Sequence, residues 1–179
     1  MHRAMLLGAI VSGMTIAPAV MASPHVQEFH AVLSGFNEVP LSINSDGRAT
    51  FELKVNRAAQ TISYVLRYSG LTSVTQSHIH FGKVHIAGGI MVFLCTNLGN
   101  GPTSTPACPA SSGTVTGTLT AADVLGPTAQ GVAASSFQDL LDALESDTTY
   151  VNVHTTGFPG GEIRGELRRG FGFGLHDED

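Results

Sequence analysis

The chain has 179 residues, a formal net charge of −5 and only 13% charged residues. It has no long run of Lys and Arg, so the composition argues against electrostatic binding of nucleic acid or of an anionic membrane surface. A chain of this length can bury one hydrophobic core without help from metals, and we expect a single domain.

The first 22 residues have the pattern of a cleavable signal peptide. Arg3 precedes the apolar run AMLLGAIVSGM, and the small or apolar residues Val20, Met21 and Ala22 suit a signal-peptidase site. The run is too short and too broken for a stable membrane span, although an uncleaved anchor is the alternative. We expect cleavage after Ala22, a secreted or periplasmic location, a folded domain over residues 23–169 and a flexible tail over residues 170–179.

Short runs in which apolar and polar residues alternate follow along most of the chain. This two-residue period is typical of half-buried strands, and Gly-rich and Pro-rich turns separate the runs. In the first run, Phe29, Ala31 and Leu33 share one face, whereas His30 points away from them and receives no role. We expect strands over residues 28–35, 48–55, 61–70, 74–82, 89–95, 113–120, 149–155 and 161–167.

One segment, SSFQDLLDALES, has its apolar residues at helical spacing. Ser136 and Asp139 are spaced as in a capping box, so we expect one short helix near residues 136–145. Together with seven or eight strands, this predicts an all-β fold, an antiparallel Greek-key β-sandwich or barrel with a single helix.

The chain contains two cysteines, Cys95 and Cys108. In an exported protein such a pair is expected to form a disulfide, and two free thiols are the alternative. Zinc binding through these cysteines is not expected, because neither has a second Cys or His close by in the sequence.

Histidines are concentrated in the segment SHIHFGKVHIAGG, residues 77–89. On a strand, His78 and His80 project from the same face, and a third ligand from elsewhere would allow them to bind one Cu or Zn ion. His85 lies between Gly residues and is expected to be a solvated loop residue.

The strand at 149–155 supplies a candidate for that third ligand, His154. It shares a polar face with Asn152, and the next strand carries Glu162 and Arg164 on a corresponding face. The alternative is a purely structural role, in which the histidines are hydrogen-bonded residues of a polar sheet end and Glu162 pairs with Arg164. No Gly-x-Ser-x-Gly motif or phosphate-binding loop is present.

Several motifs, taken in order and spacing over residues 28–167, resemble the CHRD domain, a module named for its repeats in chordin and found alone in many secreted bacterial proteins. They are LSGFNEVP, DGRATFEL, ISYVLRYSGL, SHIHFG, GTLTAADV, LLDAL and YVNVHTTGFPGGEIRGEL. The resemblance implies an extracellular or periplasmic β-sandwich, and function follows from it less directly than fold does.

A fainter similarity is to copper-zinc superoxide dismutases, which are also exported β-sandwiches with a His-x-His strand, a later Val-His, an Arg near the end and a disulfide. In this chain the corresponding histidines are His78, His80 and His154, and Arg164 corresponds to the arginine. A cluster of zinc-loop residues is missing from the sequence, and His85 is the one candidate for a bridging histidine. The similarity is compatible with a mononuclear copper site and does not support a dismutase with both metals.

Two hypotheses about function result. The first is an exported CHRD-domain module that binds or scaffolds an unknown protein or envelope partner, without evident catalytic machinery. The second is a metal-binding protein that could be redox-active, with copper preferred over zinc. Its ligands would be His78, His80 and His154, supported by Asn152, Glu162 and Arg164.

Overall fold

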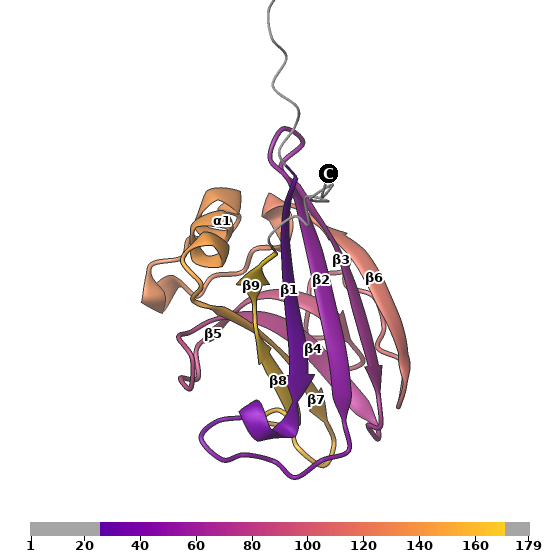
Figure 1. Ribbon diagram of the computed structural model, residues 1–179. Helices are drawn as coiled ribbons and strands as arrows, with labels where there is room; N and C mark the ends of the chain where they lie inside the picture. The colour runs from indigo at the N-terminus through magenta and orange to yellow at the C-terminus, as the bar shows by residue number, and fades with distance from the viewer. Residues whose placement is uncertain (1–25, 171–179) are drawn as a thin grey trace, which may run out of the picture.

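The computed structural model describes residues 26–170 (Figure 1). The expected signal peptide, its cleavage site after Ala22 and residues 171–179 of the expected tail lie outside the described residues. Gly170, which we assigned to the tail, donates its backbone N–H to the carbonyl of Glu28 at 2.8 Å.

The protein is an all-β protein with one α-helix, as predicted. The expected strands are all present, and their ends differ from the prediction by at most two residues. The short strand β9 and three single-turn 3-10 helices were not predicted. The strands are β1 (Gln27–Ser34), β2 (Arg48–Asn56), β3 (Thr61–Ser69), β4 (Val74–Phe81), β5 (Gly89–Thr96), β6 (Gly113–Leu119), β7 (Thr149–Thr155), β8 (Ile163–Glu166) and β9 (Arg168–Arg169); the helices are α1 (Phe137–Glu145), η1 (Gly35–Asn37), η2 (Ala121–Asp123) and η3 (Thr128–Gln130).

The strands form one antiparallel sheet in the order β5-β4-β7-β8-β1-β2-β3-β6, with β9 paired to β1. Strand β7 follows β6 through the long connection 120–148 and returns to lie beside β4, with β5 on the other side of β4, as in a Greek-key arrangement. The sheet curls so that β4 and β5 pass behind β1, β2 and β3 (Figure 1). Its end strands β5 and β6 approach each other, which gives a nearly closed barrel.

The hydrophobic core lies between the two halves of this curled sheet. In β2 buried and exposed residues alternate strictly, and in β1 the predicted residues Phe29, Ala31 and Leu33 are all buried. The facing half contributes Val151 and Val153 from β7 to the same cluster. Alternation with a period of two therefore assigns one face of each strand to the core, and burying each large apolar side chain stabilises the fold by about 1.5–3 kcal/mol.

Helix α1 begins as the sequence predicts, but only half of the capping box forms. The hydroxyl of Ser136 accepts a hydrogen bond from the backbone N–H of Asp139 at 3.2 Å. The carboxylate of Asp139 accepts instead from the backbone N–H of Ala133 at 2.7 Å. Leu140 and Leu144 are buried, so the apolar face of the helix packs against the hydrophobic core.

Cys95 and Cys108 form the predicted disulfide. It joins the end of β5 to the segment that leads into β6. Asn97 reinforces the same connection, because its amide group donates to the carbonyl of Cys108 and accepts from the N–H of Cys108.

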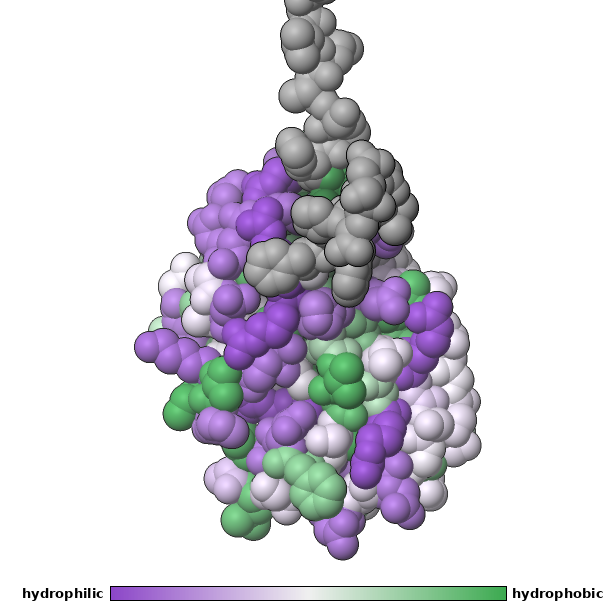
Figure 2. Space-filling model, in the orientation of Figure 1, coloured by the Kyte–Doolittle hydropathy of each residue, from purple (hydrophilic) through white to green (hydrophobic). Residues whose placement is uncertain are grey.

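The face seen in Figure 2 is mostly hydrophilic, and its hydrophobic side chains lie in small separate groups. This fits the exposed, polar residues that alternate with buried ones along β1 and β2. Within residues 26–170 no helix combines the length and the apolar character that a membrane crossing requires.

Candidate metal centre

The pairing of β4 with β7 brings the two histidine-bearing segments side by side. In this antiparallel register His80 lies opposite Tyr150 and His78 opposite Asn152, with His154 two residues further along β7. His78, His80 and His154 each offer a nitrogen, and these three nitrogens lie within 4.8 Å of one another. In the described part of the chain they are the one such group of three potential metal ligands.

The histidines lie on the side of β4 and β7 that faces away from the main core, yet they are buried. Ile79, Val151 and Val153 occupy the core side, as alternation requires. His78 is 0% exposed, and His80 and His154 are only 7% and 6% exposed.

The surroundings of the rings explain this burial. The ring of Phe93, from β5, meets His78 edge-on at 4.3 Å between centroids. The loop 82–88 and the turn 156–161 supply carbonyl groups that contact the other two imidazoles. The site is therefore interior, whereas the sequence pattern predicted a polar face at one rim of the sandwich.

Backbone carbonyls determine which ring nitrogens carry hydrogen in two of the histidines. His80 Nδ1 lies 2.9 Å from the oxygen of Gly88, and His154 Nδ1 lies 3.0 Å from the oxygen of Pro159. A carbonyl oxygen only accepts, so both Nδ1 atoms are donors. In a neutral ring the Nε2 atom then presents a lone pair. That of His154 faces His78 Nδ1 and the side-chain amide of Asn152, and His80 Nε2 is buried without a hydrogen-bond partner.

His78 completes the group. Its Nδ1 lies 3.1 Å from His154 Nε2, and its Nε2 is buried without a partner. Two nitrogens that are bound to the same ion, each at about 2 Å and in a tetrahedral or trigonal arrangement, lie about 3.3–3.5 Å apart. The spacing between His78 Nδ1 and His154 Nε2 is close to that value, whereas the nitrogens of the group as a whole lie within 4.8 Å of one another, so side-chain rotation is needed to bring one nitrogen of each ring to a single ion.

Burial also determines the charge of the cluster. Desolvation, followed by repulsion from the neighbouring histidines, lowers the pKa of His78 from 6.5 to about 2. Desolvation lowers the pKa of His80 to about 4, and the positive charge of Arg164 contributes to this shift. The pKa of His154 is lowered as well, again by burial. Burial therefore favours the neutral form of all three rings, in which one nitrogen of each carries the lone pair that a metal ligand needs.

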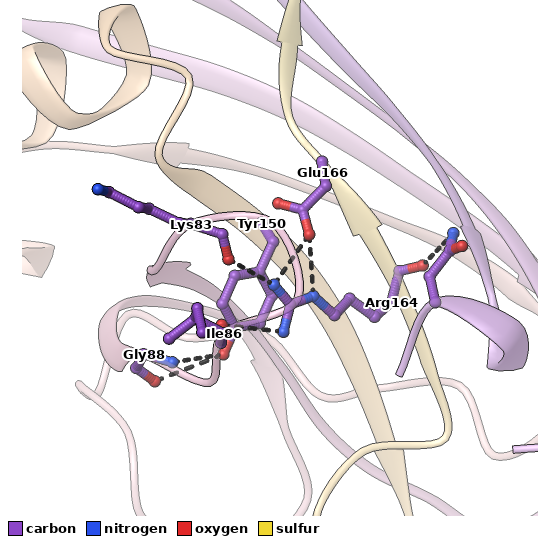
Figure 3. Close-up of polar contacts among 7 residues, drawn as sticks. Lys83, Ile86, Gly88, Tyr150, Arg164 and Glu166 are labelled. Atoms are coloured by element: carbon purple, nitrogen blue, oxygen red, sulfur yellow. Dashed lines mark hydrogen bonds and ion pairs between the residues drawn. The ribbon is translucent and has the colours of Figure 1, made fainter. Parts of the chain in front are cut away.

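Arg164, on β8, is 1% exposed and anchors the loop that covers the site (Figure 3). Its Nη1 donates to the carbonyl of Ile86 at 3.1 Å and its Nη2 to the carbonyl of Lys83 at 3.2 Å. Nε and Nη2 both donate to Oε1 of Glu166. The guanidinium thus links β8 to the loop that carries Gly88, the partner of His80.

Tyr150 connects this network to the histidines. The guanidinium carbon of Arg164 lies 3.4 Å from the centre of the Tyr150 ring, a cation-π contact. His80 stacks on the same ring, with centroids 4.7 Å apart and planes within 5°. Because β7 lies between β4 and β8, the Tyr150 ring is held between the imidazole and the guanidinium.

The expected pair between Glu162 and Arg164 does not form. Glu162 accepts hydrogen bonds from the hydroxyls of Ser45 and Thr155, both at 2.6 Å. Arg164 pairs with Glu166 instead, at 2.8 Å. Glu162 therefore joins the turn before β2 to the end of β7, a contact that alternation along one strand cannot predict.

Glu38 is a second buried carboxyl beside this network. It is 6% exposed, and its Oε1 has no hydrogen-bond partner. Burial raises its pKa from 4.5 to about 7, although the amide of Val39 and the charge of Arg164 oppose this shift. Gly161 has a φ of +130°, a conformation that favours glycine, and a Cβ atom there would lie 2.6 Å from Glu38 Oε1, so any other residue would also displace this carboxyl.

Three residues that the structure places at this site, Tyr150, Glu166 and Glu38, were not among the predicted site residues. Alternation places Tyr150 on the face of Asn152 and His154, but it does not predict the contacts of the Tyr150 ring with His80 and Arg164. Glu166 is two residues after Arg164 on the same strand, so alternation places both on one face but does not predict their ion pair. No pattern in the sequence predicts that Glu38 is buried at this site, because its position depends on tertiary packing.

The remaining candidate histidines lie elsewhere. His30 is exposed on β1, as predicted, and His85 is an exposed loop residue with φ of +63°. Neither belongs to the three-histidine group.

Comparison with protein families gives one match: the model for the CHRD domain covers residues 29–167, which is most of the chain. No curated protein and no solved structure matches the chain.

Proposed function

Because this chain belongs to the CHRD domain family, we propose that it is an exported module whose function is to bind or scaffold a partner outside the cytoplasm. The observation that carries the proposal is the family match over nearly the whole described domain. The disulfide between Cys95 and Cys108 supports an oxidising compartment, since such bonds persist there and are rare in the cytosol.

Fractionation of cells that express the full chain tests the export. The expected result is a protein outside the cytoplasm that begins at Ser23 by mass spectrometry, with both cysteines resistant to alkylation before reduction. A cytoplasmic protein with two reactive thiols would contradict it.

Cross-linking of the same cells tests the binding role. We expect a reproducible adduct between the tagged chain and one envelope or extracellular protein. Adducts with itself alone, or none, would count against a scaffolding role.

A second candidate function is metal binding, and one observation favours it: three buried imidazoles each offer a nitrogen, and these nitrogens lie within 4.8 Å of one another. A buried polar atom without a partner costs about 1–3 kcal/mol, and two of the ring nitrogens are in that position. An ion at the centre would satisfy them. His78, His80 and His154 are the proposed ligands, and copper or zinc is the proposed ion, because imidazole suits both.

Metal analysis of the mature chain, purified without a histidine tag, tests this candidate. We expect about one equivalent of copper or zinc per chain, and none in the double variant His80→Ala/His154→Ala. The matched control is His30→Ala, which removes an exposed histidine from β1 and should leave uptake unchanged. Uptake that survives the double variant would refute this site.

A further inference from the structure

We infer that the ion this site is built to hold is monovalent copper, Cu(I), bound by three nitrogens, in preference to Cu(II) or Zn(II). The inference rests on the proposed metal-binding function and specifies its ligand. It is carried by the charge of the donor set, the burial of the site and the groups that surround it.

The donor set brings no negative charge. The cluster consists of three histidines, and no carboxylate or thiolate of the described residues belongs to it. Both cysteines are used in the disulfide. A neutral donor set leaves the full charge of the bound ion uncompensated.

Burial raises the electrostatic free energy of an uncompensated charge. The three ligands are at most 7% exposed, so water cannot solvate the ion well. The electrostatic cost of burying an ion grows with the square of its charge, so a divalent ion costs about four times as much as a monovalent ion of equal size. A divalent ion would need an anion beside it.

None of the neighbouring carboxyl groups belongs to the group of potential ligands. Glu166 pairs with Arg164, so the pair as a whole is neutral. Glu162 is engaged by the hydroxyls of Ser45 and Thr155, and Glu38 packs against Gly161. The cation closest to the histidines, Arg164, is separated from His80 only by the Tyr150 ring, and it repels a second positive charge.

Aromatic side chains line the cluster. Phe93 meets His78 edge-on and Tyr150 covers His80 face-on. Zn(II) normally takes a fourth ligand, either a protein group or a water. A d10 Cu(I) ion is stable with three ligands, so a three-nitrogen site with apolar walls suits it better.

Competition titrations under anaerobic conditions test the inference on the full mature chain. With bicinchoninate as the competing Cu(I) chelator and a chromophoric chelator for Zn(II), we expect one equivalent of Cu(I), bound at least about 100-fold more tightly than Zn(II). X-ray absorption should show a three-coordinate Cu(I) edge. If Zn(II) or Cu(II) binds as tightly as Cu(I), the inference is wrong while metal binding stands. If no ion binds, the metal-binding function itself fails.

A substitution beside the site tests the premise that the site lacks an anion. The side-chain amide of Asn152 lies 3.0 Å from His154 Nε2, so Asn152→Asp places, at almost the same volume, a carboxylate that can compensate or bind a divalent ion. We expect the preference for Cu(I) over Zn(II) to fall by at least about tenfold. The control Asn56→Asp changes the same residue type at the exposed end of β2, where the side-chain oxygen accepts from the N–H of Ala59, and should leave the ratio unchanged. An unaltered ratio in Asn152→Asp would overturn the charge argument.

Discussion

Replacing Glu38 with Gln should make the protein more stable at alkaline pH and leave it unchanged at acidic pH. The carboxyl of Glu38 is buried, and its pKa rises from 4.5 to about 7 in the folded protein. The folded state therefore keeps this proton at pH values where the unfolded chain has lost it. The stability that Glu38 contributes is complete below about pH 4.5 and is lost as the pH rises through about 7.

The size of the effect follows from the same pKa shift. At about 1.4 kcal/mol per pKa unit, the shift corresponds to a loss of about 3 kcal/mol above pH 7. A glutamine at this position carries no charge at any pH, so Glu38→Gln avoids that loss. We expect its free energy of unfolding to exceed that of the wild type by up to about 3 kcal/mol at about pH 9 and to match it near pH 4.5.

Urea denaturation of both proteins at the two pH values measures this difference. Titration of the histidines affects the wild type and the variant equally, so it cancels in the comparison. The control is Glu52→Gln, an exposed residue of β2, for which we expect changes within about 0.5 kcal/mol at both pH values. A stability difference that is the same at both pH values would refute the assignment of a buried, proton-binding carboxyl.

Three further predictions follow from the same region. Arg164→Leu should lower the free energy of unfolding by about 3–5 kcal/mol, because it leaves Glu166 and two loop carbonyls without their partner. Urea denaturation measures this loss, and a loss below about 1 kcal/mol would contradict the stabilising role of these contacts. The double variant Cys95→Ala/Cys108→Ala should lose about 3 kcal/mol by the same assay, since the disulfide closes a loop between residues 13 apart, and an unchanged midpoint would show that the loop is held by other contacts. In the metal-free protein, the free energy of unfolding should fall as the pH drops below about 6.5, because the histidines bind protons in the unfolded chain and stay unprotonated when buried in the fold. The variant His78→Gln should reduce the dependence of this free energy on pH by about 1.4 kcal/mol per pH unit. An equal pH dependence in both proteins would exclude a buried neutral His78.

The sequence alone determined the local structure of this protein. Alternating apolar residues predicted the strands to within two residues at each end, and the spacing of Phe137, Leu140 and Leu144 predicted α1. The two-residue period also placed His78 and His80 on one face, and the cysteine count predicted the disulfide. These features depend on the period of the backbone and on residue types, both of which can be read along a single segment.

The tertiary structure alone decided how these segments meet. The pairing of β4 with β7, about 70 residues apart, places His154 beside His78, and it depends on how the whole sheet curls around its core. Loops bury the cluster that alternation had placed on an outer polar face. The partner of Arg164 proved to be Glu166, and Glu38 became a buried acid, because side-chain pairing and desolvation depend on neighbours that are distant in the chain.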